Sequence, residues 1–214
     1  LLARAICQEP EVIVLDEPTS FLDIRHKLEL LAILKQMVHE KHVAVLMSLH
    51  ELDLAQKVSD LVICVHGDRI ERMGVPEEIF TDEYIHHLYG VTAGSYNAAF
   101  GCLELDAPRG EPEVFVIAGG GSGIPVFRQL QRKGIPFEVG VLPENDVDYQ
   151  VARALSEHVI SERAFEEISE EKVQEALAVM RRCSRVICAV SCFGTVNRRC
   201  EELKKEAERM GLLQ

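Results

Sequence analysis

The sequence predicts an α/β protein made of two domains in tandem. Three observations support this fold class. Short runs of β-branched and aliphatic residues alternate with stretches in which apolar residues recur at helical spacing. Acidic or glycine-rich segments directly follow two of these runs, as loops do at the carboxyl ends of parallel strands. Small and polar residues dominate the stretch 93–113, so we expect a linker there between a domain at 1–92 and a domain at 114–214.

The first half contains two β-branched runs, a turn at His66-Gly67-Asp68 and a proline, Pro76, suited to the first turn of a helix. The expected elements are a helix ending at Glu9, a buried strand at 11–15, a helix at 25–38, a buried strand at 43–47, a helix at 52–58, hairpin strands at 61–65 and 69–73, a helix from Pro76 and a helix at 83–89.

In the linker, Tyr96, Phe100, Leu103 and Leu105 suggest that part of the segment packs down as an arm. The second half then alternates strands with helices, which predicts a small Rossmann-like parallel sheet covered on both faces. Its expected strands lie at 114–118, 137–142, 158–160 and 185–190, with helices at 125–133, 147–155, 173–180 and 200–210.

The composition excludes several classes of protein. Of the 214 residues, 47% are apolar and 27% are charged, which is typical of a globular chain, and no apolar run is long enough to span a membrane. The net charge of −12 argues against a nucleic-acid partner. Seven cysteines without a leader sequence favour the reducing cytoplasm. The chain begins at Leu1 in helical register, which suggests a piece of a longer protein.

Two carboxylates stand at the end of the first predicted strand. Asp16 and Glu17 follow Leu15 directly, and His50 closes the next strand-like run. One carboxylate at such an edge can hold Mg²⁺ through its hard oxygen atoms, and the other can act as a general base toward water. His50 could reach a terminal phosphate there, although for His50 taken alone an ordinary buried histidine is the simpler interpretation.

Residues 1 to about 91 resemble the later part of an ABC-transporter ATPase. Val12–Pro18 resembles the Walker B strand, Ser20–Asp23 the D-loop, and Ser48–Glu51 the segment that carries the switch histidine. The resemblance implies that Asp16 coordinates Mg²⁺, Glu17 is the catalytic base and His50 reads the γ-phosphate of ATP. It places Ser20 and Asp23 in the loop that contacts the opposite subunit.

The D-loop and the segment after His50 look most similar to importers of the iron-siderophore, haem or cobalamin type. The resemblance therefore implies ATP and Mg²⁺ as cofactors. It implies membrane permease subunits and a second ATPase subunit, in a homodimer, as partners. It also implies a place at the inner face of the cell membrane.

The sequence departs from this family in one important respect. It contains no Gly-x-x-x-x-Gly-Lys-Ser/Thr motif, so the Walker A loop that holds the β- and γ-phosphates is missing, as are the Gln loop and the signature motif. Without that cradle, the metal ligand and the base have nothing to act on. We expect the chain alone neither to bind ATP tightly nor to hydrolyse it.

A glycine-rich loop opens the second domain between a buried strand and a helix. Its residues are Gly119, Gly120, Gly121, Ser122 and Gly123. Backbone N–H groups at such a loop can hold an anion, so we expect an anionic or nucleotide ligand, against the alternative of a tight turn without a ligand. The dinucleotide fingerprint is incomplete, because Ile124 occupies the position of its third glycine. Further candidates at the same edge are Glu144, Asp146 and Thr195.

Two alternatives to the transporter interpretation remain. This half resembles an uncharacterised extension found on some importer-type ABC ATPases, so the chain could be a regulatory module that senses a metabolite. It could instead house a nucleotide-dependent enzyme, for which Glu144, Asp146 and Cys192 are the candidate groups. Four cysteines, at 183, 188, 192 and 200, do not have the spacing of a zinc or ferredoxin site.

Overall fold

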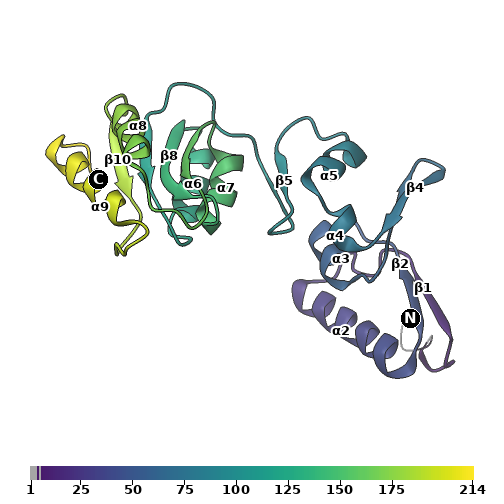
Figure 1. Cartoon of the computed structure of the whole chain (residues 1–214). Helices are drawn as coiled ribbons and strands as arrows, with labels where there is room; N and C mark the ends of the chain where they lie inside the picture. Colours follow the sequence, from purple (N-terminus) through teal and green to yellow (C-terminus); the bar gives the residue numbers. More distant parts are fainter. Residues whose placement is uncertain (1–3, 5) are drawn as a thin grey trace. The chain divides into compact units, whose positions relative to one another are not determined.

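The computed structural model describes residue 4 and residues 6–214. The chain forms two compact units, one of Leu1–Leu88 with Phe100–Cys102 and the other of Tyr89–Ala99 with Leu103–Gln214. The predicted N-terminal helix falls largely on residues 1–3 and 5, which lie outside the described residues. In the described part of the chain, no helix has the length and apolar character needed to cross a membrane. Figure 1 shows the elements of both units.

The N-terminal unit combines a parallel strand pair with an antiparallel hairpin. β1 and β2 pair in parallel with Leu15 opposite Met47, and β3 and β4 pair in antiparallel around Gly67. Gly67 has a φ of +62°, a conformation that the tight turn requires and glycine adopts without strain. The elements are β1 (Val12–Leu15), α2 (Ile24–Lys41), β2 (Ala44–Met47), α3 (Leu52–Val58), β3 (Val62–His66), β4 (Arg69–Gly74), α4 (Pro76–Ile79) and α5 (Asp82–Tyr89).

Only one face of the β1–β2 pair is covered within the described residues. Ile13 on that face forms a small core with Met37 of α2 and with Val43. The opposite face exposes three apolar side chains, at 58% for Val12, 71% for Val14 and 53% for Leu46. The prediction of buried strands at 11–15 and 43–47 therefore holds for one face of the pair only, because α2 supplies a single layer of helix among the described residues.

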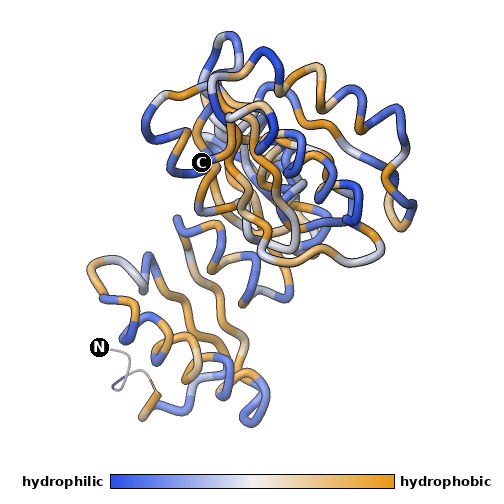
Figure 2. The backbone as a smooth tube through the Cα atoms, turned by 90° about the vertical axis from the view of Figure 1, so that its left-hand side faces the viewer, coloured by the Kyte–Doolittle hydropathy of each residue, from blue (hydrophilic) through white to orange (hydrophobic). Residues whose placement is uncertain are grey.

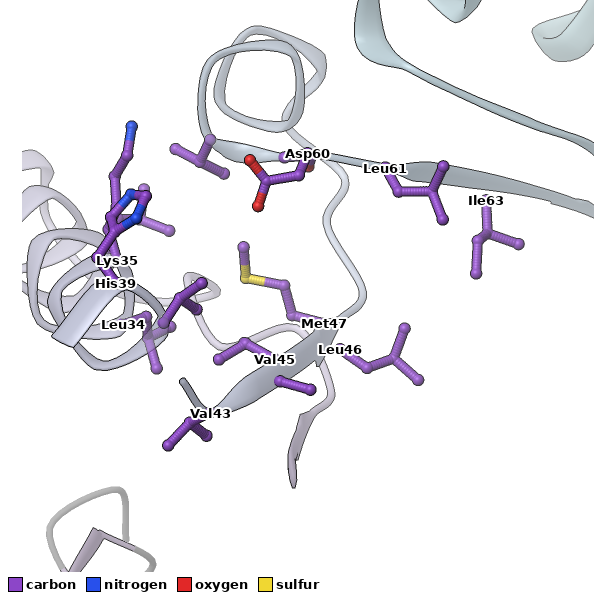
Figure 3. A pocket seen from close by; sticks show the side chains of 15 residues that line it. Leu34, Lys35, His39, Val43, Val45, Leu46, Met47, Asp60, Leu61 and Ile63 are labelled. Atoms are coloured by element: carbon purple, nitrogen blue, oxygen red, sulfur yellow. The ribbon is translucent and has the colours of Figure 1, made fainter. Parts of the chain in front are cut away.

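A groove runs along β2 in the same unit (Figure 3). It has a volume of about 370 Å³, and its lining includes Ala44–Met47 of β2, residues of α2, and the segment from Val58 to Ile63. In Figure 3 the side chains of Lys35 and His39 lie on one side of the groove, and the carboxylate of Asp60 points toward them from the other side. β1 is the partner of β2 in a two-stranded sheet, so the groove follows the other edge of β2.

The C-terminal unit contains a four-stranded parallel sheet in the order β10-β7-β8-β9. Val114 and Val116 of β7 pack with apolar residues of α6 and α7, whereas Phe115 and Ile117 pack with those of α8 and α9. The predicted α/β class with a parallel sheet covered on both faces is thus confirmed here. Figure 2 shows hydrophobic strands inside this unit and more hydrophilic segments around them. The elements are β7 (Val114–Ile117), α6 (Ile124–Arg132), β8 (Phe137–Pro143), α7 (Val147–Leu155), β9 (Val159–Glu162), α8 (Glu170–Met180), β10 (Arg185–Cys188) and α9 (Arg198–Arg209).

The segment predicted as a linker contains two short strands, β5 (Ser95–Asn97) and β6 (Cys102–Glu104). Tyr96 is 1% exposed, and Asn97 donates from Nδ2 to the carbonyl oxygen of Gln150 in α7 at 3.2 Å. This part packs as an arm, as Tyr96 suggested. Leu103 and Leu105 are 64% and 70% exposed, so the expectation that they pack as well is wrong.

Candidate functional site

Parallel pairing brings the polar ends of β1 and β2 together. The N–H of Ser48 donates to the carbonyl oxygen of Leu15, which continues the pairing by one residue beyond the strands. Ser48 Oγ then accepts from the backbone N–H of Glu17 and donates to Oδ1 of Asp16, both at 2.7 Å. Ser48 therefore fixes both acidic residues at once, a role that the sequence analysis missed.

Glu17 and His50, which the sequence analysis placed at the ends of neighbouring strands, are in direct contact at this edge. The Nε2 atom of His50 lies 2.6 Å from Oε1 of Glu17, and Ser20 Oγ donates to Oε2 of Glu17 at 2.9 Å. The hydrogen bond from His50, followed by that from Ser20, holds the pKa of Glu17 below its usual range. Glu17 is thus an exposed, ionised carboxylate at neutral pH, oriented by two neighbours.

A second set of contacts ties the loop after β1 to the segment after β2. Thr19 is 2% exposed, and its Oγ1 donates to Oε2 of Glu51 at 2.6 Å. Lys27 of α2 donates to the other carboxylate oxygen of Glu51, and this contact lowers the pKa of Glu51. Thr19, Lys27 and Glu51 were not predicted as site residues. Their only signal in the sequence was that they lie close to the predicted residues Glu17, Asp23 and His50.

Asp23 has a local role in this structure. Its Oδ1 accepts from the backbone N–H of His26 at 2.9 Å, which caps the N-terminus of α2, and lies 2.8 Å from Nδ1 of the same histidine. The backbone hydrogen bond is the main cause of the lowered pKa of Asp23. The cap orients the loop 16–23 relative to α2.

The donor set fits Mg²⁺ only in part. Asp16 and Ser48 present oxygen atoms, which are the ligands that Mg²⁺ prefers. Among the described residues there is no group of three or more His, Cys, Asp or Glu side chains arranged to hold a metal ion. Because Mg²⁺ commonly uses one or two carboxylates together with substrate phosphates, a single carboxylate remains compatible with such an ion.

A second candidate site lies at the carboxyl ends of β7, β8 and β10. β7 lies between β8 on one side and β10 on the other, so the strand order reverses at β7. Open α/β sheets form a ligand crevice at such a point. A cavity of about 400 Å³ is present there. It is lined by Ala118, Gly119, Gly120, Ser122, Val141, Pro143, Asp146, Val190, Ser191, Cys192, Val196 and Asn197.

The glycine-rich loop donates its N–H groups to carboxylates of the chain itself. The N–H of Gly120 lies 3.0 and 2.9 Å from the two carboxylate oxygens of Asp146. The N–H groups of Gly123 and Ile124 donate to Asp148, at 3.0 to 3.2 Å. Asp148 is fully buried, and burial raises its pKa, with a further contribution from the charge of Asp146. The sequence analysis missed Asp148, whose only signal was its place in the first turn of α7.

The glycines of this loop divide into two roles. Gly120 and Gly121 have φ values of +64° and +85°, which make the turn over the cavity possible. A Cβ atom on Gly123 would lie 2.3 Å from Cζ of Phe127 and 2.6 Å from Cβ of Ala118, so this glycine allows α6 to pack close to β7. Gly123 was predicted to bind a cofactor, but it is buried in a packing position.

Of the predicted residues, Gly119, Gly120, Ser122 and Asp146 line the cavity. Gly121, Gly123, Glu144 and Thr195 are not among the described residues that line it. Cys192 is exposed at its mouth, whereas Cys183 and Cys200 are buried, and burial raises the pKa of each of these thiols to about 11. Only part of the predicted ligand-binding residues of this unit therefore lines the cavity.

Comparisons with known proteins extend over both units. Residues 137–213 match the MJ0874 family. The chain is 37% identical to an uncharacterised ABC transporter ATP-binding protein of Methanocaldococcus jannaschii, over 66% of this chain and 49% of that protein. It is 32% identical to a cobalamin import ATP-binding protein of Halobacterium salinarum, over 72% of this chain and 40% of that protein. It is 36% identical to a ferric enterobactin transport ATP-binding protein of Escherichia coli, over 50% and 36% respectively.

The chain spans about half the length, or less, of these relatives. Because two thirds of the chain is longer than either unit, the match to the Methanocaldococcus protein includes residues of both. The Walker B, D-loop and switch-histidine motifs predicted this relationship from the N-terminal unit alone. The homologues of this chain are the ATP-binding proteins of ABC transporters.

Proposed function

We propose that the chain is the later part of the ATP-binding subunit of an ABC importer for a metal chelate, such as an iron-siderophore or cobalamin. The observation that carries this proposal is the 2.6 Å contact between Glu17 and His50 at the ends of two paired parallel strands. The relatives include a cobalamin import protein and a ferric enterobactin transport protein, which supports the same class of substrate.

In this proposal the residues of the first site divide the work of ATP hydrolysis among them. Asp16, held by Ser48, would hold Mg²⁺, and Glu17 would accept a proton from the attacking water. His50 orients Glu17 and contacts the terminal phosphate. Ser20 and Asp23 belong to the loop that meets a second ATPase subunit. ATP and Mg²⁺ would supply the phosphoryl group and its charge compensation.

The exposed apolar surface of the N-terminal unit supports the view that more of the domain belongs there. Val12, Val14 and Leu46 form an uncovered face, and the groove along β2 leaves room beside an edge strand. Burying such a face contributes about 25 cal/mol per Å², so an isolated unit forgoes this stabilisation. We propose that the phosphate-binding part of the ABC domain covers this surface in the complete protein.

The proposal also covers the protein partners and the cellular location of the complete protein. The complete protein would work with membrane permease subunits and a second copy of the ATPase, at the inner face of the cell membrane. The names of the homologues as import and transport ATP-binding proteins support this assignment.

The test is an ATP hydrolysis assay on two forms of the protein. The chain alone should hydrolyse ATP no faster than its E17Q variant, because no Walker A loop is present. A fusion that adds the preceding half of the Methanocaldococcus relative should hydrolyse ATP, and E17Q in the fusion should lower the rate by about 100-fold or more. Hydrolysis by the chain alone above the E17Q background, or a folded fusion unaffected by E17Q, would count against the proposal.

A second function is favoured by the cavity at the turning point of the C-terminal sheet. We propose that this unit is a regulatory module that binds a small ligand there. The match to the Methanocaldococcus ATP-binding protein, which includes residues of both units, supports a role tied to the transporter. An enzyme in this unit has less support. Of its three candidate groups, Asp146 and Cys192 line the cavity but Glu144 does not.

A further inference from the structure

The cavity of the C-terminal unit is poor in positive charge. None of the described residues that line it is Lys, Arg or His, and Asp146 contributes a carboxylate to the wall. Asp148 adds a second carboxylate directly behind the glycine-rich loop. A phosphate placed in this cavity would lie beside the like charge of Asp146 without a counter-ion from the lining, which is unfavourable at short range.

Three of the N–H groups that could bind a phosphate already donate to carboxylates of the chain. Phosphates at Rossmann-like loops take N–H groups of the loop and of the first turn of the helix that follows. Here the N–H of Gly120 donates to Asp146, and those of Gly123 and Ile124 donate to Asp148. Asp148 thus takes the place at the N-terminus of α6 that an anionic ligand would occupy.

Asp146 keeps the capacity to accept one more hydrogen bond from the cavity. Its Oδ1 accepts from Gly120 and from the N–H of Asp148, whereas Oδ2 accepts from Gly120 alone among the described residues. A carboxylate oxygen can accept two hydrogen bonds. Apolar walls from Ala118, Val141, Val190 and Val196 complete the space around this acceptor.

We propose that the cavity binds an uncharged molecule of the nucleoside class, whose hydroxyl groups donate to Asp146 and whose apolar face packs against the valine walls. The inference rests on the proposed ligand-binding role of this unit and specifies its ligand. Glycines 119 and 120 allow the ligand to approach the backbone closely, and Ser191 and Asn197 provide polar groups on the β10 side. The predicted anion-binding role of the loop is replaced by one in which the loop holds Asp146 in position.

The experiment uses the full chain and two probes, adenosine and inorganic phosphate, at matched ionic strength. Binding is followed by amide chemical shifts of residues 119–122 in NMR titrations. We expect saturable shifts with adenosine and none with phosphate. D146N retains an N-cap residue for α7 but loses the charge, and should weaken adenosine binding by about 10-fold, the equivalent of one hydrogen bond to a charged group. E144Q, an exposed position outside the cavity lining, is the matched control and should bind as the unmodified chain does.

The possible outcomes separate the inference from the role on which it rests. Saturable binding of phosphate without binding of adenosine would leave the ligand-binding role standing and overturn the nucleoside assignment. Equal loss of adenosine binding in D146N and E144Q would also overturn it, because the contact with Asp146 would not be specific. Absence of binding for both probes would count against the inference and the role together.

Discussion

Glu17 and His50 lie 33 positions apart in the sequence, and their side chains meet at 2.6 Å because β1 and β2 are paired in parallel. The contact lowers the pKa of the carboxylate. His50 is the largest cause of the lowered pKa of Glu17, with Ser20 second.

H50A should therefore raise the pKa of Glu17 toward its ordinary value near 4.5, since the hydrogen bond and the charge of the imidazole are both lost. The pKa is measured from the carboxyl carbon shift of Glu17 in NMR titrations. H39A, which changes an exposed histidine of α2, serves as the control and should leave this pKa unchanged. An unchanged pKa in H50A would show that Ser20 or the loop backbone dominates instead.

The buried carboxylate of Asp148 predicts a pH effect on the stability of the C-terminal unit. Burial raises the pKa of Asp148 above its ordinary value of 3.8, so the folded state holds a proton that the unfolded state releases. Its contribution to the free energy of unfolding should fall as pH rises from near 3.8 through the raised pKa. The side chain of D148N cannot titrate. In urea unfolding, the free energy of unfolding of D148N should therefore increase relative to that of the unmodified chain as pH rises over that window. A difference independent of pH would contradict the raised pKa.

D148A tests the same side chain as a hydrogen-bond acceptor. It leaves the N–H groups of Gly123 and Ile124 without their acceptor, which should lower the free energy of unfolding by about 2–3 kcal/mol. D148N retains an acceptor oxygen and should be more stable than D148A at neutral pH. Equal stability of the two variants would mean that water replaces the carboxylate.

The packing of α6 on β7 depends on the absence of a side chain at Gly123. G123A would place a Cβ atom against Phe127 and Ala118, and should lower the stability of the unit by about 1–3 kcal/mol. G194A is the control, because a Cβ there would meet only the side-chain oxygen of Asn197 at 3.9 Å. Thermal unfolding of both variants measures the difference, and similar melting temperatures for the two would contradict the packing argument.

The uncovered face of the β1–β2 pair should cause self-association of the chain. Val14 and Leu46 lie opposite each other on this face and are more than half exposed. We expect the chain to associate at high concentration and the double variant V14K/L46K to remain monomeric, because like charges on facing positions oppose the contact. Light scattering after size-exclusion chromatography distinguishes the two. The double variant V65K/I70K, at exposed and paired positions of β3 and β4, adds the same two charges and serves as the control.

The sequence was sufficient to predict features that depend on local pattern. The β-branched runs placed β1, β2 and β7 within a residue or two, and they placed Asp16, Glu17 and His50 after the ends of two neighbouring strands. It could not show that Asp148 occupies the N-terminus of α6, because that contact depends on how α7 packs against a loop 24 residues earlier. It also could not show that Val12 and Val14 are exposed, since an aliphatic strand looks the same whether one face or both are covered.

The exposed thiol of Cys192 makes the cavity accessible to a chemical probe before any ligand is known. Among the described residues, Cys7 and Cys192 are the exposed cysteines, and they lie in different units. Maleimide alkylation should therefore modify these two first, since a thiolate forms far less readily at the buried cysteines. A compound that fills the cavity should slow the labelling of Cys192 and leave that of Cys7 as an internal reference. A mixture of candidate metabolites could then be screened in a single tube, with the protein's own side chain as the reporter.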